Sequence, residues 1–427
     1  MSARPGPWAR LSTTLMLERR ETRLLLASAT ADSFGTGIFT ATSVLFFTQV
    51  RGFDVTSVGL AISLGSLCAF VLSPRIGKLA DRVGVKKSLI TLFLIRAFGY
   101  ALYLAADRYW LFAVLACLVT TADRSSPAIN MTVMGRLFEA KERATILGTM
   151  YTARNGAIVL GSLAATLPVV TGSTALYMVG VAVNAGSFIA AAVLMSRLQV
   201  PEPATTTGGE GGKRARGKGA SPLRDRRYLA ITVVNGVAMT HNTILALVLP
   251  LWVTQATDAP SWGLTTLLAL NGALAMAAQV PVNRRFADFA AALRAPVFGG
   301  VAVFLACAAY AASGTVSQGW AALAILVVAM VAHTAGECLF TASTPLSYEL
   351  APKESLAQYL SFYNLGRVGQ DLVGPVLIVA PLVKHGTPLW LLIGVLVMAA
   401  GLVPRAVLGR HHLATGAAPA VAEEAAG

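Results

Sequence analysis

Residues 155–196 read NGAIVLGSLAATLPVVTGSTALYMVGVAVNAGSFIAAAVLMS and contain no charged side chain. A helix needs about 20 apolar residues to cross the hydrocarbon core of a bilayer, and this stretch is about twice that length. The turn-forming residues Thr171-Gly172-Ser173 interrupt it near the middle. The stretch therefore predicts two membrane-spanning helices joined by a short connection.

The composition of the whole chain is that of a membrane protein. Of its 427 residues, 55% are hydrophobic and only 13% are charged, and the mean hydropathy is +0.65. Soluble domains carry about 25% charged residues, so a disordered or secreted soluble chain is excluded and an enzyme is not expected. The four cysteines lie in apolar stretches and lack the spacing of a metal site or a disulfide framework. We therefore expect no metal and no cofactor.

The gaps between charged residues, together with segments that carry only isolated charges, predict an all-α membrane fold of twelve helices. The expected ranges are about 24–48, 55–76, 87–106, 109–135, 143–169, 173–196, 227–254, 260–283, 295–313, 318–348, 354–382 and 387–408. The longest connection holds Pro201-Glu202-Pro203, a Thr and Gly tract and the basic run 213–218. This composition is typical of a flexible linker.

The linker divides the chain into two halves that resemble each other. Aligning Arg154 with Arg367, a shift of 213 residues, also aligns Gly156 with Gly369. Transporters built from two such repeats commonly bind substrate between the halves, near the bilayer midplane. The predicted divisions are an N-terminal tail at 1–23, a six-helix bundle at 24–197, a linker at 198–226, a second six-helix bundle at 227–408 and a C-terminal tail at 409–427.

The basic residues predict the orientation. Of the 34 Lys and Arg residues, only Arg51, Arg108 and Lys384 fall in odd-numbered connections, and four lie inside predicted helices. The others lie at the termini or in even-numbered connections. The positive-inside rule therefore places both termini in the cytoplasm of a multi-pass cell-membrane protein. Because this rule also accounts for the net charge of +14, no nucleic-acid partner is expected.

The connection between the second and third predicted helices carries a distinctive run, Gly77-Lys78-Leu79-Ala80-Asp81-Arg82-Val83-Gly84-Val85-Lys86-Lys87. It resembles the cytoplasmic signature of the major facilitator superfamily, with Val85 where a basic residue is usual. The resemblance implies a twelve-helix transporter in which Asp81 and Arg82 join a cytoplasmic charge network. On physical grounds, glycines suit tight turns and an acid suits a helix end or a basic partner. We expect Gly77, Asp81, Arg82, Gly84 and Lys86 to form a conformational motif; the alternative is that its basic residues only anchor the chain.

Charged residues lie deep inside several predicted helices. At 1.5 Å per residue, Asp32, Asp123, Arg124 and Glu337 lie near the midplane. Because a lone charge there costs at least about 2.5–3.5 kcal/mol, each should have an oppositely charged partner or access to water. We predict proton-coupling roles for these four residues. Asp123 lies about 100° around the helix from Arg124, so the two cannot face one spot.

The expected partners follow from the resemblance and from helical spacing. Arg124 lies where the drug-exporting branch of the family carries a buried Arg in helix four, and Asp32 lies where related exporters often carry an acid. If Asp32 lies beside Arg124, binding of a substrate or a conformational change could change whether Asp32 is protonated. The alternative is that the two form a static ion pair. Arg367 and Asp371, four residues apart, should form a second pair. The partner of Arg96 is left open.

A further set of residues is predicted to line a substrate cavity. A buried His beside a Glu could relay protons, although a lone membrane His more often packs. Single aromatic residues could supply apolar walls or simply pack. The predicted cavity residues are Phe39, Tyr151, Arg154, Asn155, His241, Asn242, His333, Phe340, Tyr363 and Arg367.

The leading functional hypothesis is proton-driven export of small drug-like amphiphilic compounds by alternating access, carried out by a monomer. Helix five supports export only weakly, because Ser162 and Ala165 stand where the antiporter motif has Pro and Gly. The alternatives are a proton symporter that imports a nutrient or metabolite, and a membrane sensor that binds ligand without moving it. No Gly-x-x-x-x-Gly-Lys-Ser/Thr loop is present, so ATP-driven pumping is not expected.

Overall fold

The computed structural model describes residues 19–201, 221–260, 262–374, 377–378 and 386–414. Its described part is helical and contains no strand, so the predicted all-α fold is confirmed. Of the predicted tails at 1–23 and 409–427, residues 1–18 and 415–427 lie outside the described residues, as does most of the linker; residues 20–23 belong to α2 and residues 409–414 to α20. Within the first half the helices are α2 (Arg20–Leu45), η1 (Phe46–Val50), α3 (Val55–Val83), α4 (Val85–Tyr103), α5 (Tyr109–Leu137), α6 (Ala140–Ala164), α7 (Thr166–Thr171) and α8 (Thr174–Ser196).

The second half begins with a short 3-10 helix. Its elements are η2 (Pro222–Arg224), α10 (Arg226–Ala238), α11 (Thr240–Thr243), η3 (Ile244–Val248), α12 (Leu249–Gln255), α13 (Gly263–Arg285), α14 (Phe289–Ala292), α15 (Ala295–Ser313), α16 (Gly319–Thr341), α17 (Pro345–Glu349), η4 (Lys353–Ser355), α18 (Leu356–Gly374) and α20 (Thr387–Ala414). The predicted breaks near 171–173 and 313–319 are both present. The predicted helix at 318–348 is divided into α16 and α17.

Among the described residues, eight helices are long and apolar enough to cross a membrane. The other long helices are α2, α4, α5 and α18, and each carries charged residues near its middle. A search for apolar, nearly uncharged segments thus passes over four long helices that carry charged residues into the interior.

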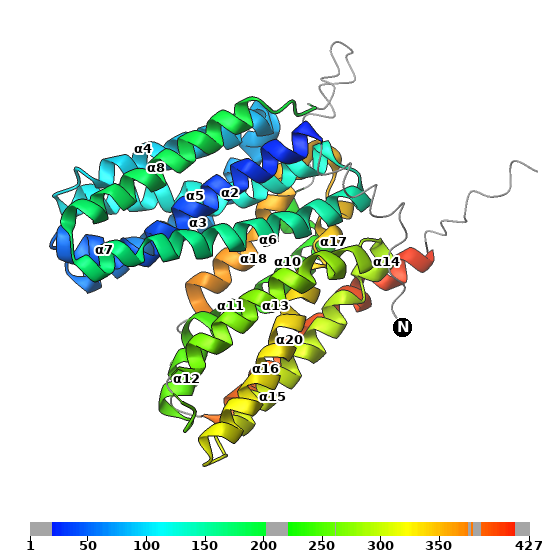
Figure 1. The fold of residues 1–427 in the computed structure, drawn as a ribbon. Helices are drawn as coiled ribbons and strands as arrows, with labels where there is room; N and C mark the ends of the chain where they lie inside the picture. Colours follow the sequence, from blue (N-terminus) through cyan, green and yellow to red (C-terminus); the bar gives the residue numbers. More distant parts are fainter. Residues whose placement is uncertain (1–18, 202–220, 261, 375–376, 379–385, 415–427) are drawn as a thin grey trace, which may run out of the picture.

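The helices form two bundles that meet at one end (Figure 1). Within the first bundle α2 packs against α6 and α8, and within the second α15 packs against α16 and α20. Between the bundles, α18 packs against α3 and α5, and α6 packs against α13. The bundles diverge toward α7 and α12. We call the end near α17 the closed end and the end near α7 and α12 the open end.

Each bundle has its own core of buried side chains. Aromatic residues dominate the first core, where the ring of Phe47 packs against those of Tyr103 and Phe112 at centroid distances of 5.0 and 4.4 Å. In the second, the indole of Trp252 packs on Trp390 at 5.6 Å and donates a hydrogen bond to the carbonyl of Tyr310. A third cluster of buried residues packs side chains of α5 against side chains of α10, α14, α17 and α18 and so joins the two bundles.

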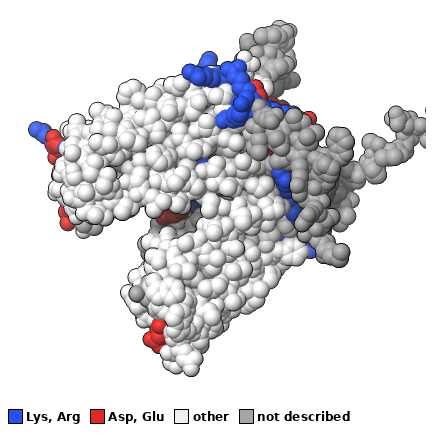
Figure 2. Space-filling view, viewed as in Figure 1, with Lys and Arg blue, Asp and Glu red and all other residues white. Residues whose placement is uncertain are grey.

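The surface of the molecule has the charge distribution of a membrane protein (Figure 2). Its long flanks show almost no charged side chain, basic residues gather toward the closed end, and acidic residues lie at the tips of the open end. The cleft between the bundles is hollowed toward the open end, with charged side chains in its depth. Buried charges therefore face the cleft between the bundles and avoid the lipid.

Candidate functional site

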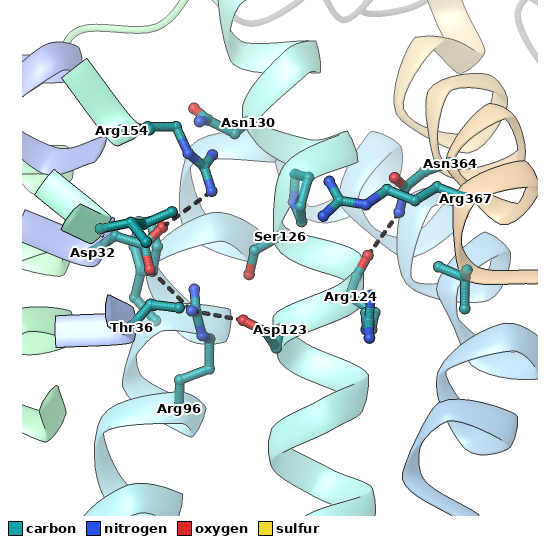
Figure 3. Close-up of a pocket in the computed structure, with 14 residues that line it drawn as sticks. Asp32, Thr36, Arg96, Asp123, Arg124, Ser126, Asn130, Arg154, Asn364 and Arg367 are labelled. Carbon is teal, nitrogen blue, oxygen red and sulfur yellow. Dashed lines mark hydrogen bonds and ion pairs between the residues drawn. The ribbon is translucent and has the colours of Figure 1, made fainter. Parts of the chain in front are cut away.

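A cavity lies between the two bundles and has a volume of about 170 Å³. The first bundle contributes side chains from α2, α4, α5 and α6, and the second contributes side chains from α18 (Figure 3). The polar and charged lining residues are Asp32, Thr36, Arg96, Asp123, Arg124, Ser126, Asn130, Arg154, Asn364 and Arg367. Phe93, Pro127, Ile158 and Val368 complete the wall. The cavity is therefore a polar site that both bundles build.

Arg96 connects two carboxylates at the inner side of this cavity. Its guanidinium lies 2.9 Å from Asp32 and 2.7 Å from Asp123, and its side chain is only 3% exposed. The guanidinium also lies over the ring of Phe188, 3.8 Å from the centroid, where the negative face of the ring favours a cation. Three interactions from α2, α5 and α8 thus hold one buried arginine of α4 in place.

This arrangement differs from the predicted pairing of Asp32. The sequence suggested Arg124 as the partner of Asp32, but Asp32 lies beside Arg96 and, at 3.9 Å, beside Arg154. Arg124 instead forms an ion pair with Asp371 across the two bundles, and its carbonyl accepts a hydrogen bond from the Asn364 side chain at 2.8 Å. The prediction that Asp371 pairs with Arg367 is therefore also wrong for this structure.

Arg154 and Arg367 are the cavity arginines with the weakest pairing. Arg154 of α6 reaches Asp32 only at 3.9 Å. Arg367 of α18 is exposed to the cleft, and no ion-pair partner for it occurs in the part of the chain that the structure describes. Figure 3 shows the guanidinium of Arg154 directed at Asp32 and that of Arg367 extended into the cavity. The two residues that align in the internal repeat thus enter one cavity from opposite bundles.

The signature run lies at the closed end, where α3 meets α18. Asp81 accepts hydrogen bonds from the backbone N–H groups of Ala357 and Gln358 at 3.0 and 2.8 Å, in the first turn of α18. Arg136 lies 3.6 Å from the same carboxylate. An acid at a helix N-terminus neutralises the positive end of the helix dipole. The carboxylate of Asp81 thus meets both a helix end and a basic partner.

Other residues of the run occupy less expected places. The sequence predicted a connection from Gly77 onward, but α3 continues to Val83, so Gly77 lies inside a helix. A Cβ at Gly77 would collide with the carbonyl oxygen of Ala357, so this glycine permits close helix packing and not a turn. Gly84, with φ of 108°, does form the turn into α4. Arg82 is exposed, without an ion pair among the described residues, and Lys86 is half-buried.

Glu337 and the two histidines lie in the second bundle and are not among the residues that line the cavity. Glu337 of α16 accepts a hydrogen bond from the side chain of Asn271 on α13 at 3.1 Å. His241 and His333 are both buried, and their rings meet edge to face with centroids 5.9 Å apart. Asn242 donates to the sulfur of Met239. These residues are thus held by neighbours within their own bundle.

The remaining predicted cavity residues are not part of this lining. Phe39 packs into the aromatic core of the first bundle, with its ring 4.6 Å from that of Tyr100. Phe340 is 4% exposed in the core of the second bundle, and Tyr363 packs at the third cluster of buried residues, near the closed end. Tyr151 is exposed and Asn155 is half-buried on α6. The apolar part of the lining thus comes from Phe93, Pro127, Ile158 and Val368 and from none of the predicted aromatic residues.

Several lining residues were missed by the sequence reasoning. Thr36, Asn130 and Asn364 carry no motif and are common residue types, so no sequence signal marks them. A sequence signal does exist for Arg96, because carboxylates near the midplane require cations nearby, but the third helix is peripheral in the resembled fold and so gives no partner for it.

Comparison with known proteins identifies the family of this architecture. A sequence model of the Major Facilitator Superfamily matches residues 25–375. No curated protein sequence matches the chain.

Solved structures share the fold over nearly the whole chain. A bacterial homologue of the iron transporter ferroportin, in an outward-facing state, is 14% identical with a TM-score of 0.66, over 92% of this chain and 99% of that one. The E. coli fucose:proton symporter is 14% identical with a TM-score of 0.67, over 90% and 98%. The human organic anion transporter MFSD10 is 13% identical with a TM-score of 0.63, over 91% and 99%. At these identities the likeness shows the fold alone.

Proposed function

The chain belongs to the major facilitator superfamily, whose members are transporters and not enzymes, and from this premise we propose that it couples the movement of a small solute to that of protons. The observation that carries the proposal is Asp32, a carboxylate held between Arg96 and Arg154 in a cavity that both bundles line. A carboxylate in such a place changes its protonation when a neighbouring charge moves. Asp32 is the proposed proton carrier.

The geometry supports alternating access. Contacts between the bundles gather at the closed end, while the cleft opens at the other. With both termini in the cytoplasm, as the positive-inside rule predicts, this is an outward-open state of a cell-membrane protein. Rocking the bundles about the cavity would separate Asp81 from α18 and bring the open ends together. We propose that a single copy of the chain performs this cycle, because the bundles of one chain form the cavity.

The mode of coupling follows from the arginine that Asp32 shares. When Asp32 gains a proton, it loses the negative charge that attracts Arg154. The guanidinium of Arg154 can then bind the solute. Proton and solute would then bind together, which favours symport over antiport. Import of a polar nutrient or metabolite, the second hypothesis from the sequence, is the direction that this arrangement supports best.

Proton-driven export of amphiphilic compounds, the leading hypothesis from the sequence, is the second candidate here. It is favoured by the place of Arg124 in helix four, and by Glu337, which lacks a cationic partner among the described residues and bonds to the neutral Asn271. In that mechanism, protonation of Glu337 or Asp32 would expel a cationic substrate.

A binding experiment separates these two mechanisms. Substrate affinity of the purified protein is measured between about pH 5.5 and 8.5. Affinity that rises toward acid pH, and loses this dependence in Asp32→Asn, supports symport. Affinity that falls toward acid pH, and loses the dependence in Glu337→Gln, supports antiport. Binding that is independent of pH and is not accompanied by flux would support the third hypothesis, a membrane sensor that binds ligand without transporting it.

Flux measurements test the coupling directly. In proteoliposomes, an imposed pH gradient should drive accumulation of a solute from a compound panel, and Asp32→Asn should abolish this accumulation while facilitated exchange persists. Asp258→Asn, which neutralises an exposed acid at the open end, is the matched control. Gradient-driven accumulation by Asp32→Asn at the level of the unmodified protein would remove Asp32 from the mechanism.

A further inference from the structure

The central cavity carries more positive than negative charge. The charged side chains that line it or pair within it come from α2, α4, α5, α6 and α18. They are the arginines Arg96, Arg124, Arg154 and Arg367 and the carboxylates Asp32, Asp123 and Asp371. With every group ionised, these four cations and three anions leave one net positive charge, however they are paired.

The observed pairing shows where the excess lies. Arg96 forms ion pairs with Asp123 and with one oxygen of Asp32. Arg124 forms an ion pair with Asp371. Arg154 lies 3.9 Å from the other oxygen of Asp32, a long distance for an ion pair. Arg367 has no carboxylate partner among the described residues. The unneutralised charge thus lies on the two arginines that enter the cavity from opposite bundles.

Such an excess is costly at this depth in a membrane unless an anion offsets it. A charge near the bilayer centre requires a partner or water, and a cluster of guanidinium groups repels itself. A guanidinium presents its N–H groups as a planar fork that matches the oxygens of a carboxylate or a phosphate. An anion between Arg154 and Arg367 would neutralise the excess and bridge the two bundles.

We propose that the cavity binds a small solute through an oxyanion, a carboxylate or phosphate group, held by Arg154 and Arg367. This inference rests on the proposed transport function and specifies its substrate class. The volume of about 170 Å³ suits a small solute, since pockets for drug-sized ligands are about 300–1,000 Å³. Neutral side chains of the wall, Asn130, Ser126 and Thr36, would bind the uncharged polar part of the solute.

The oxyanion and the proton on Asp32 would assist each other. The charged groups that face Asp32 are Arg96 from α4 and Arg154 from α6, with Asp123 of α5 beyond Arg96. Tyr100 of α4 is the other titratable side chain nearby, and α8, which also packs on α2, carries no charged residue. Protonation of Asp32 removes a competitor for Arg154, so anion affinity should rise toward acid pH.

Matched probes can test the charge of the ligand. Succinate, its neutral diamide and 1,4-diaminobutane share a four-carbon chain but carry anionic, neutral and cationic ends. Inorganic phosphate and a panel of other small carboxylates extend the anionic arm and separate carboxylate from phosphate. Binding to the detergent-purified full chain is measured by the rise in thermal stability that a ligand of the native state produces.

The expected result is stabilisation by at least one anion, at millimolar concentration, with none by the amide or the amine. Arg367→Gln and Arg154→Gln should each weaken the binding of that anion about tenfold or more, the effect of losing one charge-assisted contact. Arg285→Gln removes an exposed arginine outside the cavity and is the control. A variant that fails to fold is recognised by its melting transition without ligand, and Arg→Lys then replaces Arg→Gln.

Two results would overturn the inference. One is stabilisation by the amine, or by no anion of the panel. The other is anion binding that survives in both Arg367→Gln and Arg154→Gln. Anion binding is measured without a proton gradient, so a failure of this inference is seen as absence of anion binding. A failure of the proposed function is seen differently, because an anion would then bind but no proton would move with it in proteoliposomes.

Discussion

At the scale of single residues, Arg96 organises the interior of the first bundle. It is buried, lies against an aromatic ring and contacts two carboxylates that come from different helices. Removing one partner of a buried ion pair costs more than the pair contributes, because the remaining charges stay desolvated. Arg96 therefore stabilises the fold at the same time as it holds Asp32 in the wall of the cavity.

We expect Arg96→Ala to destabilise the protein by about 3 kcal/mol or more, since Asp123 would lose its cation and Asp32 would keep only Arg154, at 3.9 Å. Thermal unfolding in detergent measures the change. Adding Asp32→Asn and Asp123→Asn to this variant should restore much of the lost stability. An Arg96→Ala variant as stable as the unmodified protein would show that water already screens these carboxylates.

At the scale of elements, α3 and α18 form the main contact at the closed end. Gly77 lets the two helices approach closely, and Asp81 caps the first turn of α18. The two residues act differently, since one removes bulk and the other adds charge-assisted hydrogen bonds. Both stabilise the state that is open at the opposite end.

Asp81→Ala should slow turnover in proteoliposomes while ligand affinity in detergent changes little. Loss of two hydrogen bonds to a charged acceptor shifts the balance between the two states by about 1–3 kcal/mol, but Asp81 does not line the cavity. Asp81→Asn keeps an acceptor and should be intermediate. A large loss of affinity with normal cycling would contradict this role.

Gly77→Leu should disrupt the closed end, because the added side chain would meet the backbone of α18. Overpacking of this kind typically costs about 1–3 kcal/mol. Gly59→Leu on the same helix is the matched control, since a Cβ there meets no atom within 4 Å. Cysteine labelling at the closed end should increase in the first variant only; equal labelling would mean that α3 and α18 do not seal this end.

At the scale of the whole molecule, two bundles with separate cores meet around a charged cavity. The contacts between them include apolar packing, as at Gly369, where a Cβ would lie 3.3 Å from the ring of Phe70, and the ion pair of Arg124 with Asp371. Asp371, four residues from Arg367 on one helix, could change partners as the bundles rock.

The second contact between the bundles, between α6 and α13, is tightly packed at Gly148. A Cβ at Gly148 would be 3.0 Å from the Cα of Val280, closer than ordinary van der Waals contact. Gly148→Leu should therefore push the two helices apart and raise cysteine labelling at the closed end. Gly156→Leu on the same helix is the control, since a Cβ there meets no atom within 4 Å; equal labelling of the two variants would contradict a tight contact between α6 and α13.

The sequence by itself determined the helical membrane fold and most helix limits. These depend on local quantities, the length of an apolar stretch and the turn residues that end it, such as Thr171-Gly172-Ser173. The internal repeat also indicated that Arg154 and Arg367 occupy equivalent places. The extension of α3 to Val83 was missed, because a charged segment outside the bilayer gives no hydropathy signal for continuing as a helix.

Only the tertiary structure decided which charges meet. Depth along a helix follows from 1.5 Å per residue, so the sequence could place Asp32 and Arg124 at one level of the membrane. Pairing depends also on the rotation of each helix about its axis and on which helices are neighbours, and these are set by packing across the whole bundle. For this reason Asp32 lies beside Arg96, Asp371 beside Arg124, and the unneutralised charge remains on Arg154 and Arg367.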